Sequence, residues 1–384
     1  MFSHPTWAYG FRPFFLLAPA FGIATLLAWA AMLAGVLPMP ADPVGWHAHE
    51  MVFGLVAAAL GGFILTAVPS WTDTPPVTGG TLAALAAAWA VGRLASALAG
   101  LLPPWLVAVA DCAFLPWLLV HVGRPLLTRA EGRHRAFVPL LAGLCLANLL
   151  VHLGGMGLGG QMESRGLTLG VNLFALLIVV TVGRIAPVVI GLALEETGDS
   201  RRFRPHPARQ TLASAVLALY AAAELLLPGT AIAGWVALAA AAAQLDRLAD
   251  WHVGRVVLRP HVAVIYAAYW WLAIGLAMVG AAHLGAPVSA SAGRHAMGVG
   301  AFASAVLAVL TIAGLRHTGR ALRVPWQCSA AFVLVSIAAA LRVLETAHLH
   351  AWVTASVLLA LAFALYLIRF RALLTAPRED GKPG

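Results

Sequence analysis

Hydrophobic residues along this chain gather in long runs that short polar stretches separate. Each run covers roughly 20 residues, the length that a helix needs to cross about 30 Å of hydrocarbon. Most of the intervening stretches are short and hold Pro, Gly or Arg, so successive spans are expected to pack as antiparallel hairpins. The pattern therefore predicts an all-α fold, a polytopic integral membrane helical bundle of about 12 transmembrane helices. We place the spans at about 14–36, 46–69, 80–101, 104–122, 136–154, 166–192, 208–227, 229–250, 260–282, 293–315, 326–346 and 350–371.

The composition excludes a soluble globular protein. Hydrophobic residues make up 61% of the 384 residues and charged residues only 10%, and the mean hydropathy is +0.88. A soluble domain carries about 25% charged residues. The apolar stretch after Arg12 continues to Leu37, which is too long for the core of a signal peptide, so we interpret it as the first span. We predict one transmembrane domain over 1–384, with a short polar cytoplasmic tail at 373–384.

The basic residues orient the predicted helices. They are arginines apart from Lys382, and most follow the fourth, sixth, eighth and tenth spans or lie in the tail. The opposite loops hold little positive charge apart from Arg165 and Arg294. Because positively charged loops stay in the cytoplasm, both termini are predicted to be cytoplasmic. A net charge of +9 spread over short loops does not form a basic face, so no nucleic-acid partner is predicted. The loop arginines are Arg124, Arg129, Arg133, Arg135, Arg201, Arg202, Arg204, Arg209, Arg247, Arg255, Arg259, Arg316, Arg320 and Arg323.

Histidines provide the candidate chemistry, because ionisable residues are costly inside a bilayer and tend to mark sites. The chain has 14 of them. The predicted topology places one group near the outer, non-cytoplasmic surface and a pair near the cytoplasmic surface. His295 and His317 are 22 positions apart, which is about 33 Å along a straight helix, so they cannot bind the same metal ion. If both are ligands, the protein has two sites, one at each membrane face. The outer group is His47, His49, His152 and His295, and the inner pair is His261 and His317.

His47 and His49 open the second span together with Glu50. Residues two apart on a helix point about 200° away from each other. Either the segment is not helical there, or the two histidines serve different centres. Glu50 is the candidate for orienting a ligand or relaying protons on the outer side. Imidazole suits iron, copper and zinc alike, and a histidine at a span end is often only an interfacial side chain, so the histidines alone leave the role open.

Arginines within or at the start of apolar runs form a second signal. Arg93 and Arg184 lie inside such runs, and Arg12 begins one. A buried arginine can pair bidentately with a carboxylate, such as a haem propionate. The alternative is an arginine that reaches the interface or pairs with Asp111 or Glu345. The two interpretations have equal weight for Arg184, and the alternative is favoured for Arg93.

The motifs at these positions resemble those of the NnrS family of bacterial membrane proteins. The resemblance covers nearly the whole chain, and its most specific part is the segment that opens the second span. It is carried by Phe11-Arg12-Pro13-Phe14-Phe15, Trp46-His47-Ala48-His49-Glu50-Met51, Gly62-Phe63-Ile64-Leu65-Thr66-Ala67-Val68-Pro69, His295-Ala296-Met297 and Leu315-Arg316-His317-Thr318-Gly319-Arg320.

The resemblance implies an inner-membrane protein that contains haem b, in one or two copies, and copper. It also implies a role in nitric oxide metabolism, denitrification or nitrosative-stress resistance. His47, His49, His295 and His317 match family positions, and His261 matches a histidine at the start of a late span. His152 is added from topology alone. The chain departs from the family at Ser70, Asp73 and over 306–314, which affects details of the cytoplasmic site.

These observations favour a haem–copper protein that binds or reduces nitric oxide at a His-ligated haem near the periplasmic side, with Glu50 as proton relay. In that case the protein is a reductase-like oxidoreductase or a nitric oxide scavenger. The first alternative is a b-type membrane cytochrome that transfers electrons between quinol and a partner. The second is a secondary transporter, since twelve spans is a common transporter count, although no internal repeat supports it.

Overall fold

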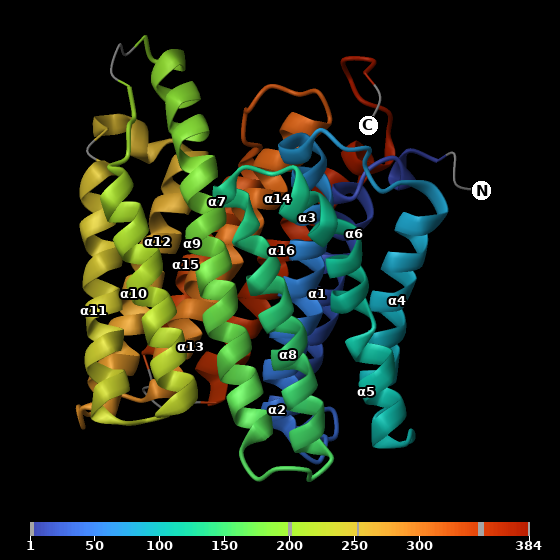
Figure 1. The fold of residues 1–384 in the computed structure, drawn as a ribbon, viewed down its shortest axis with the longest axis vertical. Helices are drawn as coiled ribbons and strands as arrows, with labels where there is room; N and C mark the ends of the chain where they lie inside the picture. Colours follow the sequence, from blue (N-terminus) through green and yellow to red (C-terminus); the bar gives the residue numbers. More distant parts are fainter. Residues whose placement is uncertain (1–3, 199–201, 252, 345–348, 383–384) are drawn as a thin grey trace. The chain divides into compact units, whose positions relative to one another are not determined.

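The computed structural model describes residues 4–198, 202–251, 253–344 and 349–382, and this part of the chain is helical with no strand (Figure 1). The predicted all-α class is therefore confirmed. The first half of the chain forms α1 (Phe11–Leu33), α2 (Pro43–His49), α3 (Ala57–Thr72), α4 (Gly79–Ala97), α5 (Pro104–Cys112), α6 (Phe114–Thr128), α7 (Gly132–Arg135), α8 (Phe137–Gly155) and α9 (Met162–Glu196). The second half forms α10 (Pro207–Leu226), α11 (Ala231–Leu248), α12 (Pro260–His283), α13 (Ala290–His295), α14 (Ala303–His317), α15 (Trp326–Val343) and α16 (Leu349–Thr375).

Among the described residues, 11 helical spans are long and apolar enough to cross a membrane. The predicted span at 208–227 corresponds to α10, which is not one of the 11. This helix carries Arg209, Gln210 and Glu224 and is more polar than the others. The polytopic helical bundle is confirmed. Of the long helices in the second half of the chain, α10 is the most polar.

Two π-helical segments interrupt the spans that carry the predicted ligands. The first, η2 (Glu50–Val56), follows His49, and the second, η5 (Ala296–Phe302), follows His295. π-Helical turns are rare and frequently occur at functional sites, because they rotate the side chains that follow. The hydrophobic periodicity of the sequence does not predict either π-helical segment.

Local contacts accommodate the first π-helical segment. A Cβ at Gly54 would overlap the ring of Phe21 and would lie 3.2 Å from Nη1 of Arg93, so glycine lets α1 and α4 approach the segment. Trp89 of α4 donates its indole N–H to the Gly54 carbonyl at 3.0 Å. The irregular backbone is thus covered and hydrogen-bonded. Asp42 begins the span by accepting the Gly45 N–H at 3.0 Å as an N-cap of α2.

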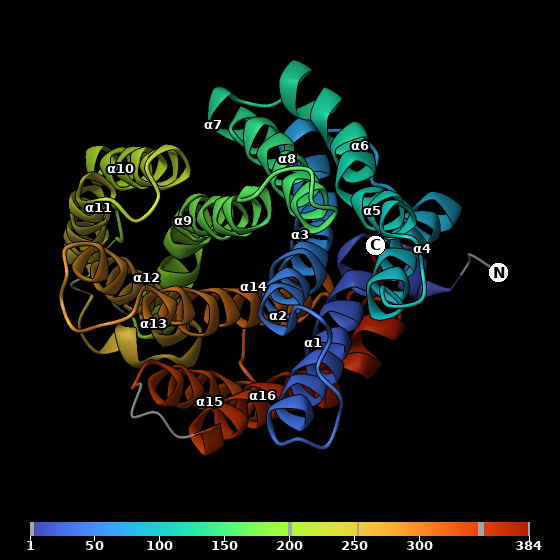
Figure 2. The same ribbon diagram turned by 90° about the horizontal axis from the view of Figure 1, so that it is seen from below.

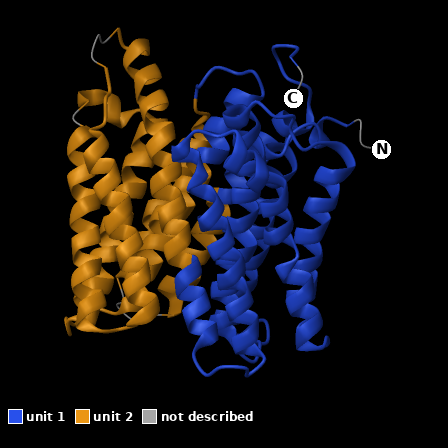
Figure 3. Ribbon diagram, in the orientation of Figure 1, with its two compact units in different colours: residues 1–170, 309–323, 363–384 blue, residues 171–308, 324–362 orange. Residues whose placement is uncertain are grey.

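The helices cluster into two compact units (Figure 3). Unit 1 comprises Met1–Gly170, Val309–Arg323 and Phe363–Gly384, and unit 2 comprises Val171–Ala308 and Val324–Ala362. In unit 1, Arg12 donates to the carbonyls of Leu374 and Ala376, so α1 begins beside the end of α16. The two ends of the chain therefore lie on one side of this unit, as the prediction of two cytoplasmic termini requires. In unit 2, α10, α11 and α12 lie side by side (Figure 2).

Candidate metal centre

One half of a buried polar cluster in unit 1 lies where α2 meets the π-helical segment. His49 ends α2 and Glu50 begins η2, and both side chains are buried. Nδ1 of His49 lies 3.0 Å from Oε1 of Glu50, and Ser96 of α4 donates its hydroxyl to that oxygen at 2.6 Å. Arg93, one turn before Ser96, donates to Oε2 of Glu50 at 2.7 Å. The Glu50 carboxylate thus joins the start of the second span to α4.

Asp111 of α5 is the centre of the other half. It is 3% exposed and forms an ion pair with Arg93. Its Oδ2 accepts from Nδ2 of Asn148 at 2.9 Å and lies 2.7 Å from Nε2 of His152. Asn148 and His152 lie one turn apart on α8, so they face the same neighbour. A Cβ at Gly92 would lie 3.0 Å from Cα of Asp111, so the glycine allows α4 and α5 to approach closely here.

His49 joins the two halves through both of its ring nitrogens. Its Nε2 lies 3.1 Å from Oδ2 of Asp111 and 3.0 Å from Oδ1 of Asn148, while Nδ1 faces Glu50. A neutral imidazole has only one N–H. Oxygen atoms at both nitrogens therefore call for one more proton within the cluster or for a cation that Nε2 shares with Asp111.

The charge balance of the cluster gives the same requirement. Glu50 and Asp111 are two buried carboxylates, and Arg93 is the one arginine that pairs with both. With neutral imidazoles the group therefore lacks one positive charge. An uncompensated buried charge in a membrane helix is strongly unfavourable. A proton within the cluster or a bound metal cation balances the charge.

The ligand atoms are suitably placed for a metal ion. His49, Asp111 and His152 each offer one ligand atom, and these atoms lie within 4.8 Å of one another. Among the described residues they form the one such group of three or more. Two imidazole nitrogens with one carboxylate oxygen suit copper, zinc or iron, and three protein ligands leave room for a further small ligand.

The structure brings together two of the four histidines predicted near the outer surface, His49 and His152. His47 points elsewhere. Its ring stacks on Trp29 of α1, with ring centroids 4.4 Å apart and an interplanar angle of 17°. The segment is helical at both positions, so the two histidines face different neighbours, as their spacing predicts.

His317 belongs to unit 1 but lies apart from this cluster. It contacts the start of the chain, where Tyr9 stacks on it at 6.4 Å and the Phe11 ring lies 5.5 Å away. The buried polar cluster, in contrast, lies at the end of α2, the helix that follows the C-terminal end of α1. Burial raises the pKa of the Tyr9 phenol, and the nearby charge of Arg378 offsets part of that rise.

The other two predicted histidine ligands lie in unit 2. His295 ends α13, and its Nδ1 donates to the Ser291 carbonyl at 2.8 Å. This hydrogen bond makes Nε2 the basic nitrogen of the neutral ring. His261, in the first turn of α12, is buried, and its Nε2 has no hydrogen-bond partner among the described residues. The arrangement of His261 is suitable for a ligand nitrogen.

The arginines predicted to pair with carboxylates have different environments. Arg93 pairs with Asp111, the alternative that was favoured for it. Arg12 is fully buried and donates to the carbonyls that end α16, at 2.9 and 2.7 Å. Arg184 lies half-buried within α9. Glu345, its alternative partner, is outside the described residues.

From the sequence, Asp111 was predicted only as a possible arginine partner, and Asn148 was not predicted as part of a site. The available signal was the spacing of Asn148 and His152, which places an amide and an imidazole on one face of a membrane helix. Asp111 lies on a separate helix, and its partners are 41 and 62 positions away in the chain. Contacts at that separation follow from helix packing and not from a local motif.

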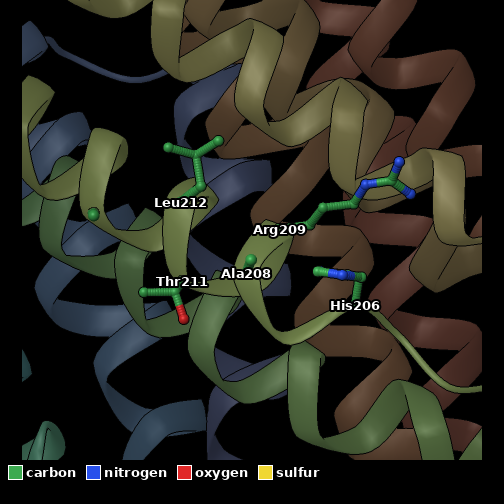
Figure 4. Close-up of a pocket in the computed structure, with 6 residues that line it drawn as sticks. His206, Ala208, Arg209, Thr211 and Leu212 are labelled. Atoms are coloured by element: carbon green, nitrogen blue, oxygen red, sulfur yellow. The ribbon is translucent and has the colours of Figure 1, made fainter.

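One open groove of unit 2 does not contain these histidines. It has a volume of about 780 Å³ and lies along the first half of α10 (Figure 4). Arg209 in its wall already pairs with Asp250 at 2.5 Å. The candidate metal centre among the described residues is therefore the buried cluster of unit 1. The groove is lined by His206, Ala208, Arg209, Thr211, Leu212 and Ala215.

Comparison with known families gives a match to the family model described as NnrS protein, over residues 5–378. The match covers nearly the whole chain and supports a membrane protein of the nitric oxide response. A comparison with curated proteins found no match.

Proposed function

Because the chain belongs to the NnrS family, we propose that it is a haem- and copper-containing protein that binds or reduces nitric oxide near the outer face of the bacterial inner membrane. The proposed copper site is formed by His49, Asp111 and His152. The observation that carries this proposal is their convergence at one buried point, in a cluster that lacks one positive charge.

Copper fits this site for two reasons. Imidazole nitrogens are good ligands for copper, and the neighbouring carboxylate favours a bound cation. A monovalent copper ion would make the cluster neutral, since Arg93 already balances one of its two carboxylates. A bound copper ion would supply an electron or a binding point for a small ligand.

His261 is the best-supported haem ligand of the inner site, which the predicted topology places near the cytoplasmic surface, because its buried Nε2 has no hydrogen-bond partner among the described residues. A haem held by His47 or His295 near the outer face would supply the iron that binds nitric oxide. His47, His295 and His317 remain proposed ligands on the basis of the family motifs. Quinol is the proposed electron donor.

Protons for nitric oxide reduction can reach the cluster through Glu50. Ser96 is only partly buried and donates to Oε1 of Glu50, and the same oxygen faces the His49 ring. This is a continuous hydrogen-bonded path from a partly exposed hydroxyl to the ring that faces Asp111. Glu50 is therefore proposed as the proton relay, and Arg93 holds its carboxylate in place.

The test is the optical spectrum and metal content of the purified full chain, recorded before and after addition of nitric oxide. We expect a Soret band that nitric oxide shifts, and copper that His152→Ala removes. His206→Ala, an exposed histidine away from the cluster, is the matched control. The haem proposal fails if the purified protein has no Soret band, or if nitric oxide leaves the band unchanged. The copper proposal fails if His152→Ala retains the wild-type copper content.

A further inference from the structure

Arg247 of α11 is a buried arginine of unit 2. It is 4% exposed. Its guanidinium donates to the Val179 carbonyl of α9 at 3.2 Å and lies 4.6 Å from the centroid of the Tyr269 ring of α12. Among the residues that the structure describes, no carboxylate pairs with it.

The acidic side chains nearest in sequence are engaged elsewhere. Asp246 and Asp250 both pair with Arg209 of α10, at 3.3 and 2.5 Å. Within the described parts of the chain, Arg247 therefore has no acidic counter-charge, although two aspartates lie within three positions of it. A buried cation in this state is strongly unfavourable unless a ligand compensates its charge.

Hydrogen-bond donors of two side chains converge on one glycine of α9. A Cβ at Gly183 would overlap Nη2 of Arg247 and would lie 2.8 Å from Nε2 of Gln210. The guanidinium of Arg247 and the amide of Gln210 therefore meet beside Gly183, where the missing side chain leaves room for both. One carbonyl, at Val179, accepts from Arg247, which leaves further guanidinium N–H groups for a ligand.

We propose that Arg247, with Gln210 beside Gly183, binds an oxyanion within unit 2. The planar guanidinium can form two parallel hydrogen bonds to a carboxylate or a phosphate. The Tyr269 ring packs on the guanidinium and keeps its plane in one orientation. Because α9 to α12 enclose the site, the anion is the polar end of an amphiphilic molecule that enters the membrane. Two sources have this chemistry. One is the propionate of a haem, and this source rests on the proposed function. The other is the phosphate of an acidic phospholipid.

The experiment uses the full chain in detergent, as wild type and as R247Q, R247K and G183A. R247Q removes the charge, R247K keeps the charge without the fork, and G183A keeps the arginine while a methyl group displaces its Nη2. R255Q is the matched control, because Arg255 is exposed in the segment that follows α11. Haem per chain is measured as the pyridine haemochrome. Lipid binding is measured as the thermal shift on adding phosphatidylglycerol, compared with phosphatidylcholine.

If the anion is a propionate, haem retention falls about 10-fold or more in R247Q and G183A, falls less in R247K and is unchanged in R255Q. If it is a lipid phosphate, haem content is unchanged and the shift caused by phosphatidylglycerol is lost in the same variants. Wild-type haem content and wild-type lipid shift in G183A and R247K would overturn the inference, even if R247Q fails to fold. A wild-type protein without haem contradicts the proposed function, whereas the lipid measurement still decides the oxyanion site.

Discussion

Nε2 of His152 lies 2.7 Å from Oδ2 of Asp111, across the interface of α8 and α5. The same oxygen faces Nε2 of His49 at 3.1 Å. Two imidazoles thus converge on one buried carboxylate oxygen, in a bundle whose surroundings are otherwise apolar. Each neutral imidazole can donate one N–H to this oxygen, but His49 then turns its unprotonated Nδ1 toward the Glu50 carboxylate, so the arrangement calls for one more proton in the cluster or a shared cation.

Replacing Asp111 with Asn preserves the size of the side chain and removes its charge. If Asp111 helps to hold the copper ion, affinity should fall by about 10- to 100-fold, measured by competition with a copper chelator. Asp73→Asn is the control, since Asp73 lies in a loop with φ 51°, a conformation that Asn tolerates well. An Asp111→Asn protein with wild-type copper affinity would remove Asp111 from the ligand set.

Arg93 pairs with two buried carboxylates, so Arg93→Gln should lower the stability of the protein by about 3–5 kcal/mol. The measurement is thermal or denaturant unfolding in detergent. Arg133→Gln is the matched control, because Arg133 is 70% exposed and pairs with Glu131, and such surface pairs contribute about 0–1 kcal/mol. Equal effects of the two substitutions would show that Arg93 does not neutralise buried charge.

Glu224 and His283 form a second buried pair, in unit 2, with Nε2 of His283 2.9 Å from Oε2 of Glu224. Arg294 lies 3.5 Å from the other oxygen. We predict a coupling energy of about 0.5–3 kcal/mol in a double-mutant cycle of Glu224→Gln and His283→Gln, measured by unfolding. Additive effects would indicate that the two side chains stabilise the protein independently.

Arg12 should hold the C-terminal segment in place rather than bind a cofactor. Its guanidinium satisfies the carbonyls of Leu374 and Ala376 at the end of α16, where the helix leaves them without partners. Arg12→Gln is expected to speed proteolysis of the tail and to leave copper content unchanged. Arg371→Gln, an exposed position on α16, is the control. Loss of haem with an intact tail would instead support the propionate role considered from the sequence.

Hydrophobic periodicity predicted the helical spans, and it placed His49 at the start of the second span, because span length and side-chain cost in lipid are local properties of the sequence. Topology also predicted that His152 ends a span on the same side. The contact of these histidines with Asp111 could not be predicted in this way, since three separate helices must pack to form it. Arg247 was interpreted as a loop arginine, and only the tertiary structure shows it buried within unit 2.

The hydrophobic periodicity of the sequence could not predict the π-helical segments either. A 7-residue π-helical segment rotates the following side chains without changing the apolar character of the span, so η2 leaves no mark on the hydrophobic pattern. Its position directly after His49 nevertheless sets the direction of Glu50 toward α4.

Copper per chain in the purified protein, measured by elemental mass spectrometry for the wild type, His49→Ala, His152→Ala and His206→Ala, tests the metal centre most directly. The cluster of His49, Asp111 and His152 predicts about one copper per chain in the wild type and in His206→Ala, and little or none in the other two. A wild-type protein without stoichiometric copper, or His49→Ala and His152→Ala proteins with the full amount, would contradict the assignment.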